Sequence, residues 1–146
     1  MRTGLLILLL VVSGCRDSVK KPDASAEVAQ RAKIVEQTKN YIDSLAAKTN
    51  TIAKLANASS GAEISQTLQQ LTAGITEWKP KYFMLRAQMI GKGIDDMDVE
   101  AYYQAAAKNV VEAFNQVEIK LRTRSDISAF DKDLERAHDK IYFLAF

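Results

Sequence analysis

The stretch that decides the fold is ISQTLQQLTAGITEWKPKYFMLRAQM, residues 64–89. Its large apolar side chains are separated alternately by four and by three positions: Ile64, Leu68, Leu71, Ile75, Trp78, Tyr82, Leu85 and Met89. This spacing places them along one side of an α-helix, in the heptad pattern that helices bury when they pack together. The pattern therefore predicts a long amphipathic helix and an all-α fold.

Pro80 lies inside this pattern. A proline within a helix removes one backbone hydrogen bond and costs about 3 kcal/mol. Because the apolar spacing is the same on both sides of it, we expect one helix over about Gly61–Ile90, kinked at Pro80, rather than two helices joined by a loop. Ser60 and Glu63 have the spacing of a capping box at its start, and the glycines of Gly91-Lys92-Gly93 are typical of its end.

Three other stretches carry apolar residues at helical spacing. They run over Ala26–Ala58, from Asp95 or Asp96 to about Arg124, and from residue 125 or 126 to the end of the chain, about 20 residues. Consecutive helices joined by short loops pack as antiparallel neighbours, and no stretch has the alternating pattern of a strand. The sequence therefore predicts an up-down-up-down four-helix bundle with short loops. The alternative is a three-helix bundle with the last helix packed elsewhere.

An even number of antiparallel helices returns the chain to the end of the bundle at which it began. We therefore expect the C-terminal sequence IYFLAF, residues 141–146, to lie near the start of the first helix. Its aromatic residues Tyr142, Phe143 and Phe146 either close that end of the core or form an exposed apolar patch, which would contact lipid or a partner.

The N-terminus has the pattern of a secretory signal peptide. Arg2 is followed by the apolar run Leu5–Val12, too short to span a bilayer, which needs about 20 apolar residues. The next residues, Val12-Ser13-Gly14-Cys15, resemble the lipobox of bacterial lipoproteins, and the resemblance covers residues 1–15 only. It implies cleavage before Cys15 and a diacylglyceryl group on its sulfur. The alternatives are an ordinary signal peptide, or a buried N-terminal helix with an incidental cysteine.

This resemblance divides the chain into a signal peptide (1–14), a lipidated tether (15–24) and a helical bundle domain (25–146). The tether is polar and its nine residues after Cys15 reach at most about 30 Å, which keeps the domain close to its membrane. Arg16, and not an aspartate, follows Cys15. By resemblance to lipoproteins of enteric bacteria, this implies the bacterial cell envelope, at the outer membrane and facing the periplasm.

The composition argues against several classes of function. The 20 Lys and Arg against 18 Asp and Glu give a formal charge of +2 and no basic footprint for nucleic acid. Cys15 is the only cysteine, and the metalloprotease, phosphate-loop and nucleophile-elbow motifs do not occur. We therefore predict no enzyme, no metal and no cofactor. The only histidine, His138, follows Glu135 at the spacing of a bundle metal site, but such sites need two of these pairs.

A helical periplasmic bundle with one histidine near its C-terminus is similar to the four-helix b-type cytochromes. In that family, a methionine near the start of the first helix and a histidine on the last helix bind the haem iron. His138 matches the histidine, but residues 26–58 contain no methionine. We therefore expect His138 at the boundary of the core. The alternative function is a haem or small-molecule carrier with a cavity between the helices, near Trp78 and His138.

Aromatic residues around Pro80 form a candidate partner surface: Trp78, Tyr82 and Phe83, together with Tyr142, Phe143 and Phe146. A kink can open a groove, and aromatic side chains are common anchors of protein interfaces. Trp78 and Tyr82 also occupy heptad positions, which favours the core instead. The function we expect is a membrane-anchored periplasmic lipoprotein, acting through an envelope protein partner as a non-enzymatic binding or accessory domain.

Overall fold

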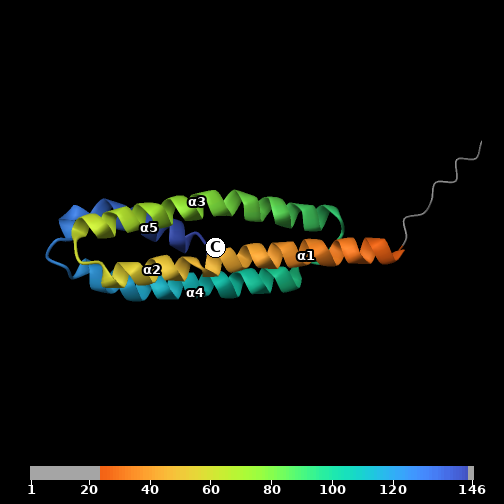
Figure 1. Ribbon diagram of the computed structural model, residues 1–146, viewed down its shortest axis with the longest axis horizontal. Coiled ribbons are helices and arrows are strands. Elements are labelled where there is room, and N and C mark those ends of the chain that lie inside the picture. The colour runs from red at the N-terminus through yellow and green to blue at the C-terminus, as the bar shows by residue number, and fades with distance from the viewer. Residues whose placement is uncertain (1–23, 145–146) are drawn as a thin grey trace, which may run out of the picture.

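The computed structural model describes residues 24–144, and these form an all-α fold without strands. The helices are α1 (Ala24–Ala46), α2 (Lys48–Asn57), α3 (Gly61–Gly91), α4 (Met97–Arg122) and α5 (Asp131–Tyr142), with a short 3-10 helix, η1 (Ile127–Ala129), before α5. In Figure 1, α2 continues the line of α1, so the molecule is a bundle of four rods that run in alternate directions. None of the described helices is both long and apolar enough to cross a membrane.

The first rod is interrupted, whereas the sequence predicted one helix over Ala26–Ala58. Ala47 lies between α1 and α2 in a turn. The hydroxyl of Thr49 donates a hydrogen bond to the carbonyl of Ala46, at 2.7 Å, and so competes with the backbone for an acceptor of the helix. The apolar stripe nevertheless continues across the break, because Leu45 and Ile52 are both buried.

Helix α3 is continuous through Pro80, as predicted. At its start the hydroxyl of Ser60 accepts a hydrogen bond from the N–H of Glu63, at 3.3 Å. The carboxylate of Glu63 reaches back to the N–H of Ser59, at 2.9 Å, one residue earlier than in the standard capping box. At the other end Gly93 makes the turn with a φ of 62°, a conformation that glycine adopts without strain.

The last helix is much shorter than predicted. It begins at Asp131, not near residue 125, and has 12 residues. The carboxylate of Asp126 accepts two hydrogen bonds from the guanidinium of Arg124 and makes no capping bond to η1. The intervening η1 packs so closely against Gly61 that a Cβ there would lie 2.8 Å from the Cβ of Ala129. Residues 125–130, which the sequence pattern had assigned to the last helix, therefore form the connection before α5 instead.

Because α5 is short, it ends half-way along the bundle (Figure 1). The hydroxyl of Tyr103 donates to the carbonyl of Leu144, at 2.6 Å, and the ammonium of Lys79 donates to the carbonyl of Phe143, at 2.9 Å. Helix α3 runs on for twelve residues beyond Lys79, to Gly91, which is about 18 Å at 1.5 Å per residue. The prediction that the tail lies near the start of the first helix is therefore wrong for the residues up to Leu144.

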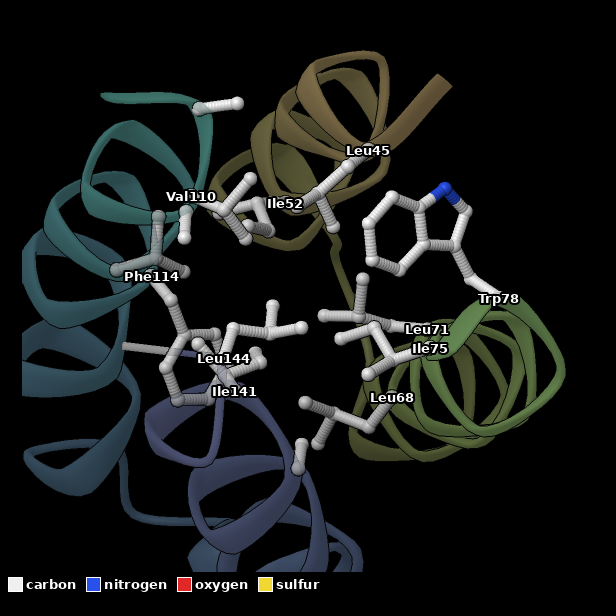
Figure 2. Packing of buried hydrophobic residues seen from close by; sticks show 14 of the residues in the cluster. Leu45, Ile52, Leu68, Leu71, Ile75, Trp78, Val110, Phe114, Ile141 and Leu144 are labelled. Carbon is white, nitrogen blue, oxygen red and sulfur yellow. The ribbon is translucent and has the colours of Figure 1, made fainter. Parts of the chain in front are cut away.

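The bundle thus has two halves. We call residues 42–57, 61–78, 104–122 and 131–144 the four-helix half, and residues 24–41, 79–91 and 97–103 the three-helix half. The four-helix half has a mainly aliphatic core to which every rod contributes. Figure 2 shows its side chains meeting from all sides: Leu45 and Ile52, Leu68, Leu71 and Ile75, Val110 and Phe114, and Ile141 and Leu144.

The three-helix half has a more polar interior. Tyr82, Tyr103 and Thr38 are buried there. Between α3 and α4, the guanidinium of Arg86 contacts the carboxylate of Asp96 at 2.9 Å and that of Glu100 at 2.7 Å. This ion-pair cluster links α3 to the start of α4, in the half of the bundle that α5 does not reach.

Candidate functional site

Trp78 and Tyr82 belong to the core, at 4% and 1% exposure. Their rings stack on each other at 5.1 Å, and Tyr41 and Tyr103 extend the stack at 5.2 Å from Trp78 and 4.5 Å from Tyr82. The indole N–H of Trp78 donates to the hydroxyl of Ser44 and to the carbonyl of Tyr41, and the Tyr41 hydroxyl donates to the carbonyl of Trp78. Trp78 and Tyr82 are therefore core residues, as their heptad spacing favours, and do not belong to the candidate partner surface.

The hydroxyls of this aromatic stack have different environments. The buried hydroxyl of Tyr82 has no hydrogen-bond partner among residues 24–144. Burial raises the pKa of Tyr82 well above its usual value, and the negative charge of Glu100 raises it further. Burial also raises the pKa of Tyr103, whose hydroxyl does have a partner in the carbonyl of Leu144.

Phe83 and Phe143 are the two candidates that the structure brings together on the surface. They are 49% and 64% exposed. The ammonium of Lys79 lies near both rings, 5.9 Å from the centre of the Phe83 ring and 5.6 Å from that of Phe143. The same ammonium donates a hydrogen bond to the carbonyl of Phe143. One lysine of α3 thus binds the end of α5 and lies close to two exposed aromatic rings.

The two rings border a groove of about 590 Å³ between α3 and α5, which we call the Phe83–Phe143 groove. Its other charged residue is Lys140 of α5, and no carboxylate lines it. Neither Lys79 nor Lys140 has an ion-pair partner within residues 24–144. The groove is therefore mainly apolar and positively charged at its rim. It is lined by Ile75, Thr76, Lys79, Pro80, Phe83, Lys140 and Phe143.

Tyr142 lies on another side of α5. Its hydroxyl donates to the side-chain oxygen of Asn115 at 2.7 Å, and its ring stacks on His138 at 4.2 Å. Nδ1 of His138 lies 3.0 Å from both carboxylate oxygens of Glu118. Tyr142 therefore fastens α5 to α4, and the half-buried His138 lies at the boundary of the core, as expected.

Glu135 does not join His138 in a metal site. Its carboxylate contacts the guanidinium of Arg122 at 2.9 Å, and Arg122 also binds Glu118. Within residues 24–144, no group of three or more His, Cys, Asp or Glu side chains could hold a metal ion. The methionines of this range, Met84, Met89 and Met97, all lie in the three-helix half, away from His138.

Sequence reasoning missed a second apolar stripe, on the outward side of α3. In the three-helix half, Pro80, Phe83, Met84, Ala87 and Ile90 are exposed at helical spacing. At the equivalent positions of the four-helix half, the exposed residues are mostly polar: Glu63, Gln66, Gln70, Ala73 and Glu77. The spacing of this outward stripe is visible in the sequence. It was overlooked because the inner heptad pattern of the same helix is longer and more regular.

Cys15 and Phe146 lie outside the described residues, as do the signal peptide and nearly all of the tether. Comparison with known proteins gives no match: no family model matches the chain, and no curated protein or solved structure is similar to it. The function must therefore be argued from the surface of the molecule itself.

Proposed function

We propose that this chain is a lipid-anchored protein of the bacterial envelope, on the periplasmic face of the outer membrane, whose helical domain binds another protein and catalyses no reaction. The lipobox pattern ending at Cys15 supports the anchor. The observation that carries the binding function is the Phe83–Phe143 groove, because two large and exposed aromatic side chains line it.

Exposed aromatic pairs of this kind support protein binding for a physical reason. Single exposed apolar residues are common on protein surfaces and need no explanation. Two neighbouring phenylalanines at the edges of a groove offer a partner a large apolar area that is lost from water at little cost in side-chain entropy. Pro80 forms part of the same wall, and the kink predicted there would widen the groove.

The alternative of a haem or small-molecule carrier has less support. Tyr41, Tyr82 and Tyr103 pack against Trp78, where the sequence suggested a cavity. We therefore propose protein binding as the function of this chain.

Site-specific photo-crosslinking in living cells tests the binding function. A photoreactive phenylalanine analogue replaces Phe83 or Phe143 in the full-length chain, and a control replaces Ile119, which is 68% exposed on α4. We expect a discrete protein adduct from the two groove positions and much less from position 119. Equal adducts at all three positions, or none at any, would contradict the proposal.

Metabolic labelling tests the anchor separately. We expect the wild-type chain to incorporate labelled palmitate and a Cys15→Ser variant to incorporate none, because the acyl chains are attached through that sulfur in the lipobox interpretation. A Cys15→Ser chain that is still labelled, or a wild-type chain that is not, would remove the anchor from the proposal and leave the crosslinking result standing.

A further inference from the structure

The position that α5 occupies on α3 continues beyond the end of α5. Ser65 and Gln69 of α3 both donate to the carboxylate of Asp133 at the start of α5, and Lys79 donates to the carbonyl of Phe143 at its end. The same face of α3, followed at helical spacing, leads next to Phe83 and then to Ile90. Beyond Phe143, α5 no longer covers this face, and Arg86 reaches from it to Asp96 and to Glu100 at the start of α4.

The length of this uncovered face sets the size of an occupant. From Lys79 to Gly91, helix α3 rises about 18 Å, which a second helix matches with about twelve residues, or three turns. Phe83 and Ile90 are both large and exposed along this distance, at 49% and 59%. A helix packed there would cover apolar surface that is now in contact with water.

The charges of this face set the chemistry of an occupant. Lys79 and Lys140 line the groove, and neither has a carboxylate partner among the described residues. Arg86 lies further along α3, but Asp96 and Glu100 already neutralise it. An occupant with acidic side chains opposite the two lysines is complementary, and one with basic side chains there is repelled.

We infer that the partner of the Phe83–Phe143 groove is an acidic amphipathic helix, which packs on α3 beyond the end of α5 and completes the three-helix half as a four-helix bundle. This inference rests on the proposed binding function. Peptide recognition by a helix in an apolar groove uses side chains at positions i, i+3 or i+4, and i+7, the spacing that this face of α3 itself presents.

Two other occupants fit this surface less well. A second copy of the chain, packed groove to groove, would bring another Lys79 and Lys140 to a groove that contains no carboxylate. A bilayer surface is flat, whereas the rings of Phe83 and Phe143 line a hollow that suits the ridge of side chains on a helix.

Mapping the adduct tests the inference. The photoreactive analogue is placed at position 83 of the full-length chain, and mass spectrometry identifies the attached segment. We expect a segment with an amphipathic helical pattern and acidic residues flanking its apolar stripe. Next, the double variant Lys79→Glu, Lys140→Glu should lower the adduct yield about tenfold, because attraction becomes repulsion at two positions. The matched control is Lys132→Glu, which reverses an exposed lysine two turns earlier on α5.

Restoring the yield completes the test. Replacing the acidic residues of the mapped segment by lysine should recover the adduct with the double variant, and circular dichroism should show unchanged helix content in every variant. An adduct with phospholipid, with a second copy of this chain, or with a segment lacking acidic residues would overturn the inference while leaving crosslinking at the groove intact. A yield insensitive to the double variant would overturn it as well. No adduct at all would instead refute the proposed function.

Discussion

The two halves of this bundle use the same α3 helix in different ways. In the four-helix half, α3 has one apolar side, which faces an aliphatic core, and its outward side is polar. In the three-helix half it has a second apolar stripe, which faces outward from Pro80 to Ile90. The difference teaches that the outward side of a single helix can be polar where four rods pack together and apolar where only three do.

The interiors differ for a related reason. Four rods enclose a wide core, which branched aliphatic side chains such as Leu68, Ile75 and Ile141 fill. Three rods enclose a narrower one, in which the rings of Tyr82 and Tyr103 are buried and stack on each other at 4.5 Å. The hydroxyl of Tyr103 is bonded to the carbonyl of Leu144, whereas that of Tyr82 is buried without a partner in the described chain.

The largest expected effect is on stability, and it differs between an inward and an outward aromatic residue of α3. Trp78→Ala should lower the free energy of unfolding by about 4 kcal/mol, since it leaves a cavity and removes two hydrogen bonds. Phe83→Ala should lower it by less than about 1 kcal/mol, because that ring is half exposed. Urea unfolding followed by circular dichroism measures both values. Equal losses would mean that the outward stripe is structural, and the comparison between the faces would fail.

High pH should weaken the three-helix half in particular. Burial raises the pKa of Tyr82 and of Tyr103, so above pH 10 the unfolded chain releases these protons while the folded chain keeps them. The free energy of unfolding should therefore fall as the pH rises, by at most about 1.4 kcal/mol per pH unit for each tyrosine. Urea unfolding at pH 9 and at pH 11 measures the fall. A Tyr82→Phe chain that loses as much stability as the wild type would show that Tyr82 does not cause it.

The smallest effect compares two buried hydroxyls at neutral pH. Tyr103→Phe removes the hydrogen bond to the carbonyl of Leu144, so it should cost about 1 kcal/mol of unfolding free energy. Tyr82→Phe removes a hydroxyl that has no partner in the described chain, so it should be neutral or slightly stabilising. Matched denaturation curves give the difference. A clear loss for Tyr82→Phe would reveal a partner for that hydroxyl.

Much of the fold follows from the spacing of apolar residues. The heptad positions Ile64, Leu68 and Leu71 are all buried, and α3 passes through Pro80 as one helix. The late start of α5 at Asp131 could not be predicted in this way. It depends on the contact of η1 with Gly61 and on the pairing of Arg124 with Asp126, and neither leaves a periodic signal in the sequence.

The candidate site was predictable in part, for the same reason. Phe83 and Phe143 were named from their residue type and position, and both are exposed. That they meet around Lys79 depends on where α5 ends, so the groove could not be derived before the length of that helix was known. The exposed stripe that includes Ala87 and Ile90 was available from spacing alone.

The stacked indole at the border of the two halves gives the molecule an optical probe of its own. Trp78 is the only tryptophan in the chain, and its N–H is bound to Ser44 and to the carbonyl of Tyr41. Its emission in the folded protein should lie at short wavelength and shift to the red if the first rod separates from α3. Fluorescence can therefore follow the contact between the first rod and α3 without any added dye. It can do so both in the free protein and when a partner occupies the neighbouring groove.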